Sequence, residues 1–285
     1  MQVLPIALSA AAALAVAPGL RQGLVDGGHT VQNYRGAQLA CPLGMIVVVA
    51  TALTAGAIGI LERFGITEAS GPVALAFVLG VATLGLFDDA YSGPSRGWRG
   101  HGAALRKGGL PTGAVKAVGT LGLAAWTATT LDGTTLGAAT QTDWVLIVAI
   151  LVLTTNLFNI VDLRPGRAVK AFVLVAIGCL IAVGTDLLDG FGAYIGAILV
   201  VAGYDLRERG ILGDTGANLL GAVAGLMLVV AITSTLGLAL CTAALLAITA
   251  YGEFRSISAF VERTPGFRHL DSIGRIHNPR KDAAA

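Results

Sequence analysis

Charged side chains are scarce in this 285-residue chain: Asp, Glu, Lys and Arg together make up 13% of it, whereas 55% of the residues are hydrophobic. With a mean hydropathy of +0.77, the composition lies far outside the range of soluble domains. The formal net charge is +2, and no basic patch indicates binding to nucleic acid. We therefore expect an integral membrane protein.

Cysteine and histidine are also scarce, and their spacing argues against two common kinds of site. The three cysteines lie in or beside apolar segments without paired spacing, so we expect packing residues and no disulfide framework. The four histidines lack the close spacing of zinc ligands. These residues are Cys41, Cys179, Cys241, His29, His101, His269 and His277.

Uncharged runs long enough to cross a bilayer recur along the chain, and each is interpreted as a helix of roughly 17–25 residues. The shortest apolar run is 190–204, which Asp189 and Gly190 interrupt. Small residues are abundant in the runs and suit close helix packing in lipid. The predicted fold is an all-α, polytopic transmembrane bundle of about nine helices: 1–20, 39–61, 71–87, 112–131, 143–158, 168–184, 190–204, 216–232 and 236–252.

Positive charge indicates the orientation, because Lys and Arg are retained on the cytosolic side of a membrane. All but one of the 19 Lys and Arg residues lie in 21–38, 88–116, 159–170, 205–215 and 253–285; the exception is Arg63. Nine helices place all of these loops on one side. We therefore predict a multi-pass plasma-membrane protein with its N-terminus outside, a transmembrane domain over 1–252 and a cytosolic tail over 253–285.

Acidic and amide residues stand at three of the predicted cytosolic junctions. Asp88 and Asp89 follow the apolar run 71–87, the motif Asn156-Leu-Phe-Asn159-Ile-Val-Asp162 ends another run, and Gly213-Asp214-Thr-Gly-Ala-Asn218 opens the eighth. Carboxylates at a membrane boundary are costly without a partner such as a cation. We expect the three motifs to meet at one surface that faces the cytosol.

Hard oxygen ligands of this kind suit Mg²⁺, which is commonly shared with substrate phosphates. The free backbone N–H groups at the start of the eighth helix could also face phosphate oxygens. Acids and cations together fit a diphosphate-bearing substrate better than either alone. The cations in the same loops are Arg96, Arg99, Arg106, Lys107, Lys116, Arg164, Arg167 and Lys170.

Each motif also has a structural interpretation. Asp214 with Thr215 could cap a helix, and Asn156 and Asn159 could bridge helices inside the bundle. The basic residues could serve only to set the topology. The adjacent pair Asp88-Asp89 is harder to explain structurally, because two like charges at the end of a membrane helix repel each other. Together the three motifs favour a functional site.

The ordered motifs, a DD pair, N-x-x-N-x-x-D and G-D-x-G, resemble those of the polyprenyl-phosphate N-acetylhexosamine-1-phosphate transferases, glycosyltransferase family 4. The resemblance covers roughly residues 1–255 and implies Mg²⁺-dependent transfer of a sugar 1-phosphate from a UDP-sugar to a polyprenyl phosphate, releasing UMP, in cell-envelope glycan synthesis such as that of peptidoglycan. It implies that Asp88 and Asp89 bind or deprotonate the lipid phosphate and that Asp214, with Asp162, ligates the metal. The implied substrate-binding residues are Asn156, Asn159, Asp162, Arg164 and a lysine, either Lys116 or Lys107.

The chain departs from the family pattern after the second motif. Family members continue with a Gly-rich D-G-x-D-G-L-A run, whereas this chain reads Asp162-Leu-Arg-Pro-Gly-Arg-Ala168, and the family's histidine-rich motif is missing. Arg164 therefore stands in place of a carboxylate and is expected either to contact the sugar nucleotide or only to anchor the loop in the cytosol.

Two other function classes remain open. A membrane prenyltransferase would also use about nine helices and Mg²⁺, but it expects two N-D-x-x-D motifs, which this chain lacks. A transporter or assembly scaffold could keep the fold without turnover, in line with the altered motifs. The motifs name neither the sugar nor the lipid, and they leave open whether the chain forms a homodimer.

Overall fold

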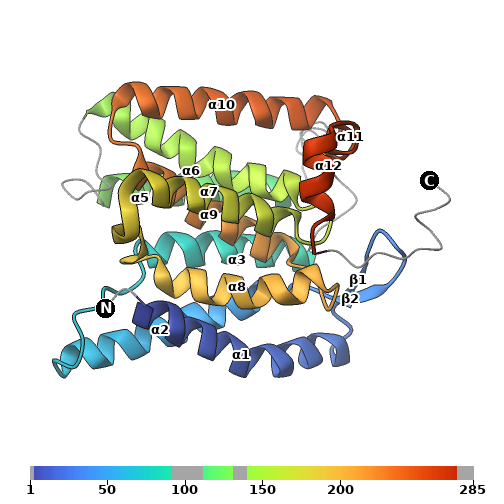
Figure 1. The fold of residues 1–285 in the computed structure, drawn as a ribbon, viewed down its shortest axis with the longest axis horizontal. Coiled ribbons are helices and arrows are strands. Elements are labelled where there is room, and N and C mark those ends of the chain that lie inside the picture. The colour runs from blue at the N-terminus through green and yellow to red at the C-terminus, as the bar shows by residue number, and fades with distance from the viewer. Residues whose placement is uncertain (1–2, 92–111, 131–139, 275–285) are drawn as a thin grey trace.

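The computed structural model describes residues 3–91, 112–130 and 140–274, and most of them lie in α-helices (Figure 1). Each of the nine ranges predicted to span a membrane overlaps one helix of 15 residues or more. These helices are α1 (Val3–Asp26), α2 (Gly44–Arg63), α3 (Leu75–Tyr91), α5 (Thr112–Thr130), α6 (Gln141–Val161), α7 (Arg167–Val183), α8 (Gly192–Leu206), α9 (Gly213–Ala231) and α10 (Thr235–Phe254).

Six segments of the described chain are long and apolar enough to cross a membrane: α1, α2, α6, α9, α10 and the stretch Arg167–Leu188, which joins α7 to the 3₁₀-helix η1 (Gly184–Leu188). The 15-residue α8 is apolar but shorter, and it begins just after the predicted interruption at Asp189 and Gly190. These apolar segments support an all-α protein that is embedded in a membrane. The number of crossings and their orientation stay predictions.

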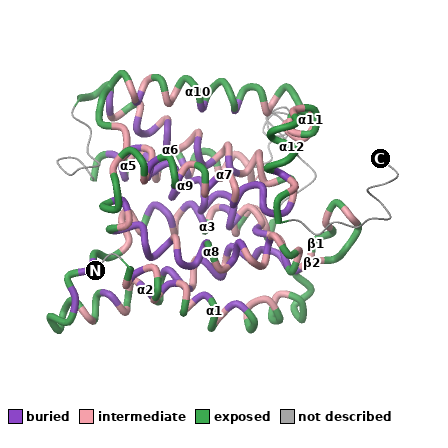
Figure 2. The backbone as a smooth tube through the Cα atoms, viewed as in Figure 1, coloured by how far each residue is buried: buried purple, intermediate pink, exposed green. Residues whose placement is uncertain are grey.

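Helix α9 lies at the centre of the bundle. Of its most apolar stretch, 78% is buried inside the protein, against 17% for α10, which runs along one side (Figure 2). α9 packs on α6, α3 and α7, while α1 packs on α8 and α2 at the opposite side from α10 (Figure 1). Small residues allow this packing, because Gly221 of α9 meets the α6 backbone at Thr155. The start of α9 is therefore surrounded by other helices.

Two parts of the structure differ from the sequence prediction. α1 continues six residues beyond the predicted end at residue 20, aided by an i, i+4 hydrogen bond from Gln22 Nε2 to Asp26 Oδ1 of 2.7 Å. A short antiparallel hairpin follows, formed by β1 (Thr30–Gln32) and β2 (Gln38–Ala40). The C-terminal segment, for which only a cytosolic tail was predicted, contains α11 (Ile257–Arg263) and α12 (Pro265–Ser272). Hydropathy could not reveal these elements, because none of them is a long apolar run.

A buried ion pair holds α12 against the start of α7. The Arg167 guanidinium donates two hydrogen bonds to the Asp271 carboxylate, at 3.0 and 3.1 Å, and both side chains are 8% exposed. Arg167 Nη1 also donates to Ser258 Oγ at 2.9 Å, and Lys170 Nζ donates to the Asp271 carbonyl oxygen at 2.7 Å. The segment after α10 is therefore docked on the bundle beside the loop that carries Asp162.

Candidate functional site

Lys116, near the start of α5, joins two of the predicted acidic motifs. Its Nζ donates to Asp88 Oδ2 at 2.7 Å and to Asp214 Oδ2. Asp88 lies near the end of α3 and Asp214 in the first turn of α9, 98 residues from the lysine. The exposed fractions of the three side chains are 16% for Lys116, 13% for Asp88 and 32% for Asp214. Helices α3, α5 and α9 therefore bring the three charges together in a partly desolvated position.

Asn159 on α6 adds the remaining predicted motif to this cluster. With its amide oriented to satisfy its neighbours, the NH₂ group donates to Asp214 Oδ1 at 2.8 Å and the oxygen accepts from Lys116 Nζ at 3.1 Å. Both carboxylate oxygens of Asp214 are then engaged, and Lys116 contacts three acceptor groups. We call Asp88, Lys116, Asn159 and Asp214 the acidic cluster.

Asp89 has a different role from its neighbour, because it caps α9 from another helix. Asp89 Oδ1 accepts from the Asp214 backbone N–H at 2.9 Å, and Oδ2 accepts from Thr215 N–H at 2.8 Å and from Thr215 Oγ1 at 2.6 Å. The residue before α9, Leu212, makes no side-chain capping bond. The interpretation of Asp214 as its own helix cap is therefore wrong. Of the N–H groups at the start of this helix that could have faced a phosphate, those of Asp214 and Thr215 are therefore occupied by Asp89.

Two glycines allow α3 and α9 to approach closely enough for this contact. Gly213 has φ +71°, a left-handed conformation, and a Cβ atom there would lie 2.8 Å from Asp89 Oδ2. On α3, a Cβ atom at Gly85 would lie 2.5 Å from the Asp214 carbonyl oxygen. Any other residue type at these positions would push the two helices apart. The Gly-Asp pair of the predicted motif thus has a steric reason as well as a chemical one.

Asp162, at the C-terminal end of α6, lies in an acidic environment. Burial is the largest cause that raises the pKa of its carboxyl above the ordinary value, and the carboxylates of Asp205, Asp214 and Asp89 raise it further, against a smaller opposing effect of Arg167. Asp205 itself is buried, and its Oδ2 accepts from the Gly166 backbone N–H at 2.7 Å. Burial and the neighbouring carboxylates therefore both favour the neutral form of the Asp162 carboxyl.

Three of these carboxylates also affect the thiol of Cys41, which lies in the segment before α2. Burial, followed by the charges of Asp89, Asp162 and Asp214, raises its pKa to about 12. The thiol therefore stays protonated at neutral pH and is a packing residue, in agreement with the prediction for the cysteines.

The oxygen donors of the acidic cluster and of Asp162 are of the chemical type that binds magnesium. Carboxylate oxygens from Asp88 and Asp214, the amide oxygen of Asn159 and the nearby Asp162 carboxylate are hard oxygen ligands of the kind that Mg²⁺ prefers. Within the described ranges, no group of three or more His, Cys, Asp or Glu side chains could hold a metal by itself. An ion here would take its remaining ligands from water and substrate phosphates, which is usual for Mg²⁺.

The other predicted substrate-binding residues fall in three places. Asn156 lies on α6 one turn before Asn159 and is half-buried, and no hydrogen bond joins its side chain to the described part of the cluster. Arg164 points to Glu262 of α11, with which it forms an ion pair, and its Cζ lies 5.6 Å from the centre of the Tyr34 ring. Lys107 lies outside the described residues.

Three residues of the site had not been selected from the sequence. Thr215 binds Asp89, and Asp205 contributes to the field at Asp162. Asn218, one turn after Asp214 on α9, is 1% exposed, and its Nδ2 has no hydrogen-bond partner among the described residues. Their positions in the sequence could have identified two of them. Asp205 ends an apolar run as Asp88 does, and Asn218 belongs to the same motif as Asp214.

Comparison with known proteins adds no relative. No protein-family model matches this chain, and no curated protein matches it. The resemblance to the N-acetylhexosamine-1-phosphate transferases therefore stays a prediction that rests on the motifs.

Proposed function

We propose that this chain is a magnesium-dependent transferase that moves a sugar 1-phosphate from a UDP-sugar to a polyprenyl phosphate at the cytosolic face of the plasma membrane and releases UMP. The observation that carries the proposal is the ion-pair and hydrogen-bond network of Lys116, which unites three motifs from four helices at the end of an apolar bundle. A site of this kind can reach a membrane-bound acceptor and a soluble nucleotide at once.

In the proposed reaction, an oxygen of the lipid phosphate attacks the β-phosphorus of the UDP-sugar. The new P–O bond forms as the bond from the β-phosphorus to the bridging oxygen breaks, and that oxygen leaves on UMP. Negative charge therefore develops on phosphate oxygens, and a preorganised cation is the group best suited to stabilise it. Lys116 is that group in this chain, and Asp88 and Asp214 hold its ammonium in position.

The four aspartates have different roles in the proposed reaction. Asp88 lies beside Lys116, where it can orient the acceptor phosphate or take its proton, whereas Asp89 is occupied by α9 and is a positioning residue. Asp214 and Asp162 would hold the magnesium ion. When bound, the ion would neutralise the diphosphate and bring it close to the carboxylates. Asn159, bonded to both Lys116 and Asp214, keeps these groups in register.

A second candidate is a non-catalytic protein of the same fold, such as a transporter or scaffold. It is favoured by one observation: Lys116 already compensates Asp88 and Asp214, so the network also suits a purely structural function at the end of three helices. The transferase is preferred because Asp162 brings a further carboxylate close to Asp89 and Asp214, which a structural pairing of Lys116 with Asp88 and Asp214 does not require.

The experiment that separates the two candidates is UMP release by the purified protein in detergent. It would be incubated with UDP-N-acetylhexosamines or the UDP-muramoyl-pentapeptide, with undecaprenyl phosphate, and with either magnesium or EDTA. Magnesium-dependent UMP release with one of these sugars is expected. The matched control is Asp189→Asn, which removes an exposed carboxylate at the other end of α8 and should retain activity. No UMP with any donor, from protein that is folded and monodisperse, would support the non-catalytic candidate.

A further inference from the structure

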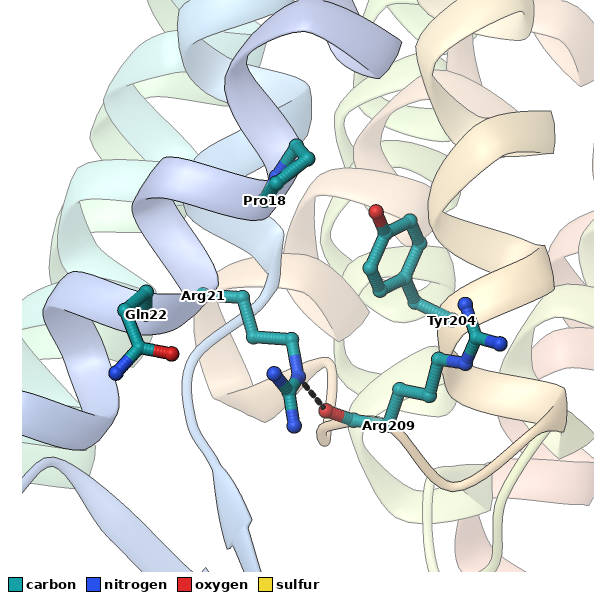
Figure 3. A pocket seen from close by; sticks show the side chains of 5 residues that line it. All are labelled: Pro18, Arg21, Gln22, Tyr204 and Arg209. Atoms are coloured by element: carbon teal, nitrogen blue, oxygen red, sulfur yellow. Dashed lines mark hydrogen bonds between the residues drawn. The ribbon is translucent and has the colours of Figure 1, made fainter.

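A cavity of about 370 Å³ lies between α1 and α8, lined by Pro18, Arg21, Gln22, Tyr204 and Arg209 (Figure 3). None of its lining residues belongs to the acidic cluster. Pro18, Arg21 and Gln22 come from the last turns of α1, Tyr204 from the end of α8 and Arg209 from the loop that leads to α9. The cavity therefore lies at the same end of the bundle as Asp214, but on the side formed by α1.

The two arginines of the cavity are fixed by contacts that leave their charge available. Arg21 Nε donates to the Arg209 carbonyl oxygen at 2.7 Å, so its two terminal NH₂ groups stay free to donate elsewhere (Figure 3). The guanidinium of Arg209 lies 6.0 Å from the centre of the Tyr204 ring, a cation–π distance. Within the described ranges, no carboxylate pairs with either guanidinium.

Two acids that are close in sequence to the lining residues are engaged elsewhere. Glu208, next to Arg209 in the chain, accepts from Asn33 Nδ2 at 3.0 Å and pairs with Arg35 at 3.5 Å. Asp26, one turn beyond Gln22, accepts from the Gln22 amide. The cavity therefore presents two unneutralised guanidinium groups, which is the donor arrangement that binds a phosphate through charge-assisted hydrogen bonds.

The surroundings of the cavity favour a phosphate group carried by a lipid over a free phosphate ion. Both helices that form the cavity are apolar, and they expose Leu14 and Leu199 deeper along their length, at 60% and 54%. Exposed leucines on an apolar helix suit contact with acyl chains, and a tyrosine beside arginines is typical of the headgroup level. We propose that this cavity is a binding site for the headgroup of one anionic phospholipid, separate from the polyprenyl phosphate of the proposed reaction.

The test measures lipid binding and requires no enzymatic activity. Purified protein would be titrated with short-chain phosphatidylglycerol, and native mass spectrometry would count the molecules retained, with phosphatidylcholine of equal chain length as the uncharged comparison. We expect saturable binding of one phosphatidylglycerol per chain. Arg21→Gln and Arg209→Gln should each raise the apparent Kd about tenfold or more, as expected for loss of a charge-assisted contact.

Arg207→Gln is the matched control, because it removes the same charge from an exposed position two residues from Arg209. It should leave the Kd within about twofold of the original, well under the 1.4 kcal/mol that a tenfold change represents. Arg21→Lys, which keeps the charge, should bind better than Arg21→Gln if the chain folds equally in both. The proposal is overturned if Arg207→Gln weakens binding as much as Arg209→Gln, if phosphatidylcholine binds equally well, or if equimolar inorganic phosphate displaces the lipid.

Discussion

Asp89 of α3 holds Thr215 of α9 at two points, with hydrogen bonds of 2.8 Å from the threonine N–H and 2.6 Å from its hydroxyl. The adjacent aspartate, Asp88, instead faces Lys116. The two neighbouring carboxylates on α3 thus have different roles. Asp89 fixes the start of the central helix, and Asp88 belongs to the acidic cluster beside it.

The first prediction separates these two aspartates by stability. Asp89→Ala removes the acceptor for three N–H and O–H groups at the start of α9 and should lower the free energy of unfolding by about 1–2 kcal/mol, the usual cost of a lost cap. Asp88→Ala should cost less, because Lys116 keeps Asp214 and Asn159 as partners. Thermal unfolding in detergent would compare the two variants. Equal loss of stability would contradict the separate roles.

The helices of the bundle could be predicted from the sequence, whereas the contacts between them could not. Each of the nine apolar runs overlaps a long helix, because a long apolar segment favours the backbone structure that satisfies its own hydrogen bonds. The partners of Asp89 lie 125 and 126 residues away, and Arg167 and Asp271 are 104 residues apart. Hydropathy carries no information on which polar groups meet across such distances. The convergence of the motifs was predictable because all of them end or begin helices on the basic side.

Arg164 tests how much of the altered loop belongs to the site. Because its guanidinium is engaged by Glu262 and lies over Tyr34, we expect Arg164→Lys to keep the KM for the sugar nucleotide within about twofold. Glu262→Gln, which breaks the same pair from the other side, should behave alike. A rise in KM of about tenfold in Arg164→Lys alone, equal to about 1.4 kcal/mol of binding, would make Arg164 a substrate contact.

The buried pair of Arg167 and Asp271 should decide whether the C-terminal segment stays docked. Asp271→Asn leaves the guanidinium buried without its carboxylate, a change that costs about 3–5 kcal/mol in buried pairs. We expect α12 to detach, so that limited proteolysis cleaves the chain between 255 and 274 at least about tenfold faster. Glu262→Gln is the matched control, because its carboxylate is 49% exposed and its pair contributes about 0–1 kcal/mol. Equal cleavage of both variants would contradict the assignment.

The predicted orientation can be measured by cysteine accessibility in intact cells. In a variant without the three native cysteines, a membrane-impermeant maleimide should label Ser70→Cys, which precedes α3, and should not label Ser272→Cys until the cells are opened. Both positions lie outside the long helices, so their access depends on the side of the membrane. Labelling of position 272 from outside would invert the topology and place the acidic cluster away from a cytosolic nucleotide.

The most direct test of the proposed transferase follows the β-phosphorus of the donor. A UDP-sugar labelled with ³²P at the β-position would be incubated with the purified protein, magnesium and undecaprenyl phosphate, and the label would be followed into the lipid phase. The account predicts that the label moves to the lipid with equimolar UMP. It also predicts that Asp214→Asn, which keeps an acceptor oxygen but loses the charge that would hold magnesium, abolishes the transfer with little change in thermal stability. Label that stays in the nucleotide, or an Asp214→Asn variant that transfers it as fast as the unmodified chain, would contradict the account.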